Sequence, residues 1–327
     1  MAQIVVGVAA SHTPQLSSGV EWWENHGERD RNNPKLLGKD GEFHTYDELP
    51  TAPEEVQEQL RPEIYQAKYE RAQKGIETLT QVLADATPDV AIVIGDDQWE
   101  MFKDEGIPAF ALFHGDQLFD EQQRDMTKVP EGIRAAQWAA HSDSRAWHTT
   151  DGKFAEHISR TLSERDYDVH WFREQREDRT LGHAFTFPRY RLGLAPEIPI
   201  VPLFINCYFP PNNPNPSRCF SFGQVVREAI ESWDPDLRVA VITSGGLSHF
   251  VVNEEMDHQI LAGLTGGDWD SFGDIPRKQM RSGSAEILNW IAAAGILEKQ
   301  TATIVDYVPG YRSPAGTGTG MAFAYWK

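Results

Sequence analysis

The segment from Arg238 to His249 reads Arg-Val-Ala-Val-Ile-Thr-Ser-Gly-Gly-Leu-Ser-His, and it is the strongest constraint on the fold. Its apolar, β-branched first half, bounded by small residues, predicts a buried strand. In an α/β protein such a strand delivers whatever follows it to the carboxyl edge of the sheet, where ligands bind. Because two glycines let the backbone turn sharply and approach a ligand closely, we expect His249 at the rim of a pocket. A simple turn with His249 as a polar cap is the alternative interpretation.

The same pattern occurs twice more in the first third of the chain. A predicted strand at Ile4–Val8 leads to Ser-His-Thr-Pro at 11–14, which places His12 just beyond it. A predicted strand at Asp89–Gly95 leads to Asp-Asp-Gln-Trp-Glu at 96–100. Adjacent carboxylates directly after a buried strand are costly unless they pair with a metal, an arginine or a backbone turn. An Asx turn with solvated acids is the simpler interpretation of this acidic group.

The remaining periodicity predicts an α/β fold, a single domain with a central mixed, mostly parallel sheet flanked by helices. Residues from about 19 to 50 are polar but contain two tryptophans, and we interpret them as an ordered, lid-like excursion over the sheet. Further strands are expected at 107–113, 167–171, 198–206, 304–308 and 321–326. Helices are expected within 53–86 (interrupted at Pro62), at 154–162, 221–233 and 254–264, and within 274–294.

Charge and cysteine content restrict the class of partner. The chain has 327 residues, with 30 Lys and Arg against 49 Asp and Glu, a formal net charge of -19. Such a field repels nucleic acid and anionic membrane surfaces, so we expect neither as a partner. Cys207 and Cys219 are too few for a disulfide scaffold and lack the spacing of a zinc site. With no basic leader and no span-length apolar segment at the start of the chain, the expected location is the cytoplasm.

Several other residues are candidates for a site. Glu286 lies beside the apolar face of a predicted helix and needs a partner, which an arginine or a metal would provide. His44, in the excursion, is a candidate ligand with an exposed structural role as the alternative. The segment 181–191 combines His183, three aromatic residues, Arg189 and Arg191, and it predicts either an aromatic-lined anion site or a solvated basic hairpin. The glycine-rich stretch 310–320 lacks the helix and lysine of a phosphate loop, which argues against nucleotide binding.

Taken together, His12, His183, His249 and Glu286 fit a mononuclear metal site with spare histidines for proton transfer. The order of the motifs resembles that of the class III extradiol ring-cleavage dioxygenases, the superfamily of the protocatechuate 4,5-dioxygenase catalytic subunit and of enzymes acting on gallate and methylgallate. The resemblance covers nearly the whole chain. It is carried by Ser-His-Thr-Pro at 11–14, Gly-Asp-Asp at 95–97, Gly-His-Ala-Phe at 182–185, Ile-Pro-Ile-Val-Pro at 198–202 and Ser-Gly-Gly-Leu-Ser-His at 244–249.

The resemblance implies an Fe(II) site built from two histidines and one glutamate. His12 matches the first histidine and Glu286 the glutamate, whereas His249 matches the acid–base residue and His183 a second histidine lining the pocket. The second histidine ligand is missing, because Gln98 stands at its position. Three outcomes follow: Gln98 binds the metal, His44 replaces the histidine from the excursion, or the site no longer holds iron.

With iron present, the resemblance implies extradiol cleavage of a catechol- or gallate-type aromatic diol by O2. Arg189, Arg191 and Arg312 are the arginines expected to hold a substrate carboxylate, since they would counter the acidic field locally. Two alternatives remain open because of Gln98: a non-oxidative, hydrolase-like enzyme, and a metal-free binding protein on the same fold. A homo-oligomer is expected, and the need for a small partner subunit is left open.

Overall fold

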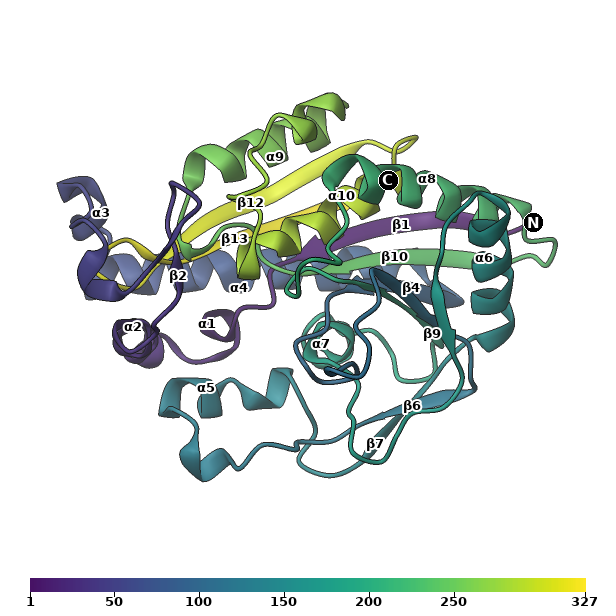
Figure 1. The fold of residues 1–327 in the computed structure, drawn as a ribbon, viewed down its shortest axis with the longest axis horizontal. Helices are drawn as coiled ribbons and strands as arrows, with labels where there is room; N and C mark the ends of the chain where they lie inside the picture. Colours follow the sequence, from purple (N-terminus) through teal and green to yellow (C-terminus); the bar gives the residue numbers. More distant parts are fainter.

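A computed structural model describes residues 1–327 and contains a nine-stranded sheet (Figure 1). The strand order is β11-β13-β1-β10-β4-β9-β5-β8, with β12 pairing on β13. These strands are β1 (Gln3–Ala10), β4 (Val90–Gly95), β5 (Phe110–Phe113), β8 (His170–Phe172), β9 (Ile200–Ile205), β10 (Arg238–Ser244), β11 (His249–Val251), β12 (Ala302–Tyr311) and β13 (Thr317–Trp326).

The centre of the sheet is parallel. Strands β1, β10, β4 and β9 run in the same direction, so their carboxyl ends meet at one edge. Antiparallel pairing lies outside this centre, where β13 joins β1, β11 and β12 and where β5 joins β9. The predicted α/β fold with a mixed, mostly parallel sheet flanked by helices is confirmed.

Alternate residues of the central strands serve two separate cores, which explains their uninterrupted apolar sequences. In β4, Val90, Ile92 and Ile94 belong to a core with helices α6 (Gly152–Glu164), α8 (Pro216–Ser232) and α10 (Ile287–Ile296). Ala91 and Val93 belong to the core on the opposite face, beneath α4 (Pro62–Ala86) and α7 (His183–Arg191). Burial on both faces removes the need for polar residues in these strands.

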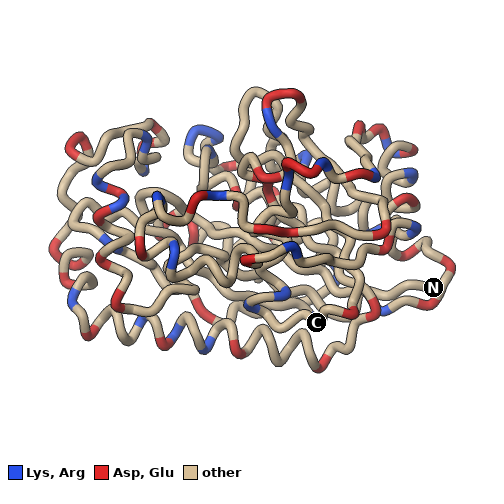
Figure 2. The backbone as a smooth tube through the Cα atoms, turned by 90° about the horizontal axis from the view of Figure 1, so that it is seen from below, with Lys and Arg blue, Asp and Glu red and all other residues tan.

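The remaining elements form the periphery of the molecule. Charged residues of both signs are distributed over the outer helices and loops (Figure 2), and none of the helices has the length and apolar character needed to cross a membrane. The peripheral helices are α1 (Pro14–Ser17), α2 (Trp23–Arg31), α3 (Glu54–Glu58), α5 (Glu131–Ala135) and α9 (Glu254–Gly266). The peripheral strands are β2 (Leu36–Leu37), β3 (Phe43–His44), β6 (Gln117–Asp120) and β7 (Ala146–Thr149).

Two local predictions have different outcomes. The expected interruption at Pro62 is confirmed, because α3 ends at Glu58 and Pro62 is the first residue of α4. The basic hairpin considered for 181–191 is wrong, because these residues form the helix α7, with Pro188 inside it.

The segment 19–50 is an ordered excursion containing α2 and the β2–β3 hairpin. Its main anchor is Trp23, which is fully buried and donates its indole N–H to the carbonyl of Gln15 at 3.0 Å. A second anchor is the buried ion pair between Asp30 and Arg312, with 2.7 Å between the Arg312 Nε and an Asp30 oxygen. The tryptophans of this segment therefore contribute to its packing rather than to an exposed surface alone.

Candidate metal centre

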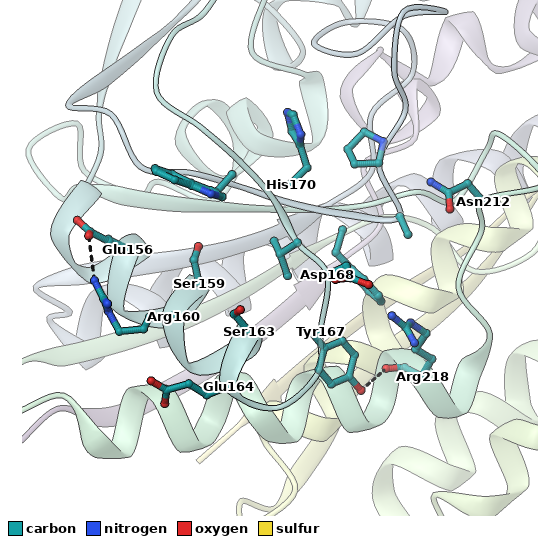
Figure 3. A pocket seen from close by; sticks show the side chains of 15 residues that line it. Glu156, Ser159, Arg160, Ser163, Glu164, Tyr167, Asp168, His170, Asn212 and Arg218 are labelled. Atoms are coloured by element: carbon teal, nitrogen blue, oxygen red, sulfur yellow. Dashed lines mark hydrogen bonds and ion pairs between the residues drawn. The ribbon is translucent and has the colours of Figure 1, made fainter.

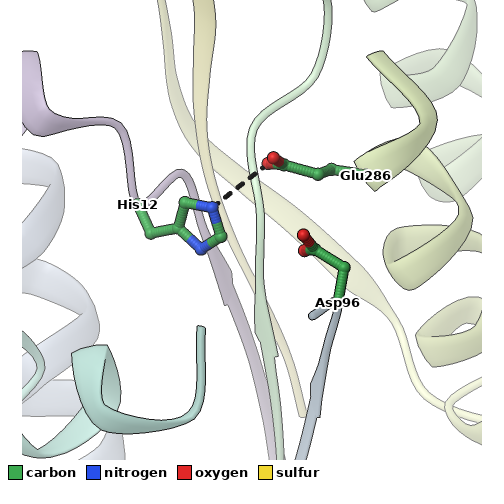
Figure 4. Close-up of side chains that lie close together, drawn as sticks. All are labelled: His12, Asp96 and Glu286. Atoms are coloured by element: carbon green, nitrogen blue, oxygen red, sulfur yellow. Dashed lines mark ion pairs between the residues drawn. The ribbon is translucent and has the colours of Figure 1, made fainter. Parts of the chain in front are cut away.

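Three buried side chains converge at the carboxyl edge of the parallel strands. His12 follows β1, Asp96 follows β4, and Glu286 is the last residue of a 3-10 turn, η6 (Ser282–Glu286), that leads into α10. One nitrogen or oxygen atom from each side chain lies within 4.8 Å of the other two, and Figure 4 shows the three side chains directed toward a common point. We call these three residues the central cluster.

His12 is held on both sides of its ring. Its Nδ1 lies 2.9 Å from the hydroxyl of Ser244 at the end of β10, and its Nε2 lies 3.3 Å from an oxygen of Glu286. A hydrogen bond to one ring nitrogen fixes the orientation of the other, as is typical of metal-binding histidines. The ring is therefore directed into the cluster by the neighbouring strand.

Glu286 depends on the Gly245–Gly246 turn. The N–H of Gly246 donates to one oxygen of Glu286 at 2.7 Å, and the hydroxyl of Tyr208 donates to the other at 2.9 Å. A Cβ on Gly246 would lie 2.4 Å from the His249 ring, so any side chain there would displace that ring. Burial alone would raise the pKa of Glu286, but the nearby His12 and His249 outweigh it and lower the pKa to about 2.

Asp96 has only neutral partners. The amide nitrogens of Gln98 and Asn289 each donate to it at 3.2 Å. Burial and the charge of Glu286 raise the pKa of Asp96 to about 6. No lysine or arginine hydrogen-bonds to either carboxylate of the cluster, so a cation bound between them would relieve a costly burial of negative charge. One imidazole and two carboxylates are a donor set that a divalent metal such as Fe(II) or Mn(II) accepts.

Two further histidines flank the cluster with opposite proton preferences. The Nδ1 of His249 lies 2.9 Å from the carbonyl of Leu247, its Nε2 is 3.9 Å from Glu286, and burial lowers the pKa of the ring. The Nδ1 of His183 lies 2.7 Å from Glu100, and its ring centroid is 4.6 Å from that of His12. Burial would lower the pKa of His183, but Glu100 outweighs it and raises the pKa to about 9. The site thus combines a neutral histidine with a protonated one.

Behind His183 the hydrogen bonds continue into the protein. The Nε2 of His141 lies 3.2 Å from Glu100, and its Nδ1 lies 3.2 Å from the fully buried Asp120. Asp120 also accepts from Tyr190 and lies 3.1 Å from the Nε2 of His148. No sequence pattern indicates a role for His141 or His148, and both belong to this buried network.

The cluster opens into a cavity of about 690 Å³. His12, Gln98, His183, His249, Glu286 and Arg312, all named from the sequence, line it. Arg29, Tyr208 and the segment 122–141 complete the wall, and the sequence contained no pattern that identified them. A separate cavity of about 740 Å³ contains no member of the cluster, and two of its polar groups are paired, Arg160 with Glu156 and Tyr167 with the carbonyl of Arg218 (Figure 3).

Three of the expected site residues lie elsewhere. His44 is bonded to the carboxylate of Asp40 at 3.0 Å and does not line the cavity, so it does not replace the missing histidine. Arg189 donates to the carbonyls of Ala195 and Ile198, and Arg191 donates to Gln73. Neither arginine lines the cavity, because both guanidinium groups fasten α7 to neighbouring segments.

The residues at 96–98 differ in role from the sequence expectation. Gln98 directs its amide nitrogen toward Asp96 and Glu286, at 3.2 and 3.4 Å, and therefore bridges the two carboxylates. Among the histidine, cysteine and carboxylate side chains, Asp96 is the third member of the cluster, and Gln98 lies beside it. The indication was present in the sequence, since a carboxylate directly after a buried strand needs a partner, but spacing alone did not separate Asp96 from Gln98.

Comparison with known proteins agrees with this geometry. Residues 52–322 match the family described as the catalytic LigB subunit of aromatic ring-opening dioxygenase. Gallate dioxygenase of Pseudomonas putida is 29% identical to the chain over 182 residues, which cover 50% of this chain and 49% of the relative. The chain therefore spans about half of the length of that curated relative.

Proposed function

Because the chain belongs to the family of catalytic LigB subunits of aromatic ring-opening dioxygenases, we propose that it cleaves the ring of an aromatic vicinal diol with O2, in the extradiol manner. The substrate class proposed is a catechol or gallate that bears a carboxylate, in keeping with the gallate dioxygenase relative. The observation that carries the proposal is the buried cluster of one imidazole and two carboxylates without a cationic side chain.

We assign His12, Asp96 and Glu286 as the residues that hold Fe(II). This set has one histidine and two carboxylates, whereas the motifs alone implied two histidines and one carboxylate. Fe(II) bound there would supply a Lewis-acidic, redox-active centre at which the diol and O2 meet. Gln98 and Asn289 support the assignment, because their amide N–H groups orient the Asp96 carboxylate and leave its negative charge available to a metal ion.

His249 and His183 divide the proton transfers between them. His249 is the general base, since its Nε2 faces the cavity next to Glu286 and burial favours its neutral form. His183 is the general acid, since the carboxylate of Glu100 keeps it protonated at neutral pH. A diol lying between the two rings would lose a hydroxyl proton to His249, and His183 would supply a proton to the oxygen atom that becomes negatively charged as the O–O bond breaks.

Arg29 is the residue proposed to meet the substrate carboxylate. It lines the cavity, its side chain is 32% exposed, and its only ion-pair distance, to Asp30, is a long 3.8 Å. Arg312 also lines the cavity, but it is paired with Asp30 at 2.7 Å. Arg312 therefore holds the carboxylate of Asp30 in place beside Arg29. Arginine suits this task because its planar group binds a carboxylate through two parallel hydrogen bonds.

The test is oxygen uptake by anaerobically purified, iron-reconstituted protein on a panel of diols, with 3,4-dihydroxybenzoate, 3,4,5-trihydroxybenzoate and catechol as the first members. We expect oxygen uptake and loss of the aromatic absorbance together, and expect Glu286→Gln to abolish both. Metal binding without oxygen uptake on any diol would favour the hydrolase-like alternative. Absence of metal binding would favour a binding protein.

A further inference from the structure

A second cavity of about 510 Å³ adjoins the candidate active site and is lined by four cationic residues, Lys35, Arg277, Lys278 and Arg281. No aspartate or glutamate lines it. In a chain with a formal net charge of -19, four positive side chains around one cavity reverse the overall field locally. We call this the cationic cavity.

The cations of this cavity are poorly neutralised by the protein. Lys278 has one ion-pair partner, Glu42, at 3.8 Å, and both side chains are exposed. The guanidinium groups of Arg277 and Arg281 donate only to backbone carbonyls, each at 3.4 Å. No ion pair is formed by Lys35 within the chain. An anion entering the cavity would therefore find charges that are not already satisfied.

Much of the remaining wall is apolar, with Tyr208, Asn213 and Ser282 as its polar members. Arg281 lies over the ring of Phe43 with 4.7 Å to its centroid. The apolar lining residues include Pro210, Pro211, Pro214, Met280 and Leu288. Proline and aromatic surfaces accommodate a carbon skeleton, and arginines bind carboxylates through two parallel hydrogen bonds. We propose that the cationic cavity binds a small organic anion that carries two or more carboxylates.

The cavity shares a wall with the candidate active site. Tyr208 lines both cavities, and its hydroxyl donates to Glu286. Ser282 lines the cationic cavity and begins the turn η6 that ends at Glu286. If the proposed function holds, the ring-opened product is a fitting ligand, because extradiol cleavage of an aromatic monocarboxylate leaves a dicarboxylate. The binding site itself does not depend on that reaction.

The experiment is titration calorimetry on the full chain with three probes: trans,trans-muconate, which has two carboxylates, sorbate, which has the same carbon chain and one carboxylate, and inorganic phosphate. We expect one saturable site for muconate, with sorbate and phosphate weaker by about tenfold or more, since each lost ion pair of this kind removes roughly a factor of ten in affinity. Binding should weaken as the salt concentration rises.

Variants locate the site. The double variant Arg277→Gln/Arg281→Gln should weaken muconate binding by about tenfold or more. If that variant does not fold, the double variant Lys35→Glu/Lys278→Glu tests the same cavity, and the same weakening is expected. Lys299→Gln, a matched exposed cation that pairs with Glu231 and lines neither cavity, should change nothing. Arg29→Gln, which removes the arginine proposed to hold a carboxylate in the candidate active site, should retain muconate binding, and this separates the two sites. Equal binding of the three probes, or unchanged binding in both double variants, would overturn the proposal.

Discussion

At the level of single residues, the chemistry of the site is determined by two negatively charged side chains that are buried next to each other. Asp96 and Glu286 carry two carboxylates into one small volume, and only amide, hydroxyl and imidazole groups surround them. The sequence predicted that the acidic residues after β4 need a partner. It did not show which side chain of this segment would provide a metal ligand, because Asp96 and Gln98 both approach the cluster. Which of them offers an oxygen depends on side-chain directions that spacing does not determine.

Replacing Arg29 by glutamine should change the choice of substrate. We expect KM for 3,4-dihydroxybenzoate to rise by about tenfold or more, because a carboxylate in the cavity loses its arginine partner. Catechol lacks the carboxylate, so its KM should stay nearly constant and provides the internal control. Steady-state oxygen uptake with both substrates measures the difference, and an equal change for both would remove Arg29 from carboxylate recognition.

Replacing Glu100 by glutamine should move the pH dependence of turnover. The pKa of His183 is raised to about 9 by Glu100, so a protonated His183 is available below that pH and is lost as the pH rises through it. Without the carboxylate the pKa falls, and the alkaline limit of kcat should shift down by about one pH unit or more. A kcat profile of oxygen uptake from pH 6 to 10 tests this shift.

Two results bear on the Glu100→Gln prediction. An alkaline limit that is unchanged in Glu100→Gln would show that His183 is not the acid. The variant Glu105→Gln is the matched control, because Glu105 is an exposed glutamate of the same region that pairs with Arg179 rather than with a histidine.

At the level of elements, the central strands β1, β4, β9 and β10 were predictable and α7 was not. These strands are largely apolar on both faces, and this composition is visible without any tertiary information. The segment 183–191 contains aromatic residues and an internal proline, which disfavour a helix locally, and packing in the second core overrides that preference.

The helical form of 183–191 also explains why Arg189 is separated from His183. At about 100° per residue, Arg189 lies roughly 240° from His183 around the helix axis, whereas Phe187 returns to within about 40°. Phe187 accordingly lines the cavity beside His183, and Arg189 does not. The expected aromatic-lined anion site required His183 and Arg189 on one surface, and the helix separates them.

The excursion 19–50 should unfold more readily in acid because of His26. This buried histidine lies 3.0 Å from the hydroxyl of Ser18, and burial together with Arg312 and Arg29 lowers its pKa to about 2. In the unfolded chain it binds a proton near pH 6.5, the ordinary value for histidine, whereas the folded chain does not. The free energy of unfolding should therefore decrease as the pH falls below that value.

Urea denaturation between pH 7.5 and 5 measures the contribution of His26. The slope of unfolding free energy against pH should be smaller in His26→Gln, whose side chain has no proton to gain. The control is His44→Gln, since His44 belongs to the same excursion but is only partly buried beside Asp40. The same slope in wild type and His26→Gln would contradict the assignment.

At the level of the whole molecule, the topology brings the site together. Parallel β1, β10 and β4 are adjacent in the sheet, so the residues after them meet at one edge although they lie far apart in the sequence. That convergence could be predicted from three strands that each end in a polar group. The contribution of the excursion to the cavity could not be predicted, because Arg29 reaches the cavity through the packing of α2, and no sequence periodicity indicates that packing.

Anaerobic equilibrium binding of Fe(II) to the full chain is the most direct measurement of whether the ends of β1 and β4 and the start of α10 form one metal site. We predict one Fe(II) per chain in the wild type, and binding weaker by about tenfold or more in Asp96→Asn, because a carboxylate ligand is removed. Asp97→Asn, whose carboxylate instead accepts the N–H groups of Met101 and Phe102, should bind like the wild type. No saturable Fe(II) binding by the wild type, or equal binding by all three proteins, would contradict the metal centre proposed for this chain.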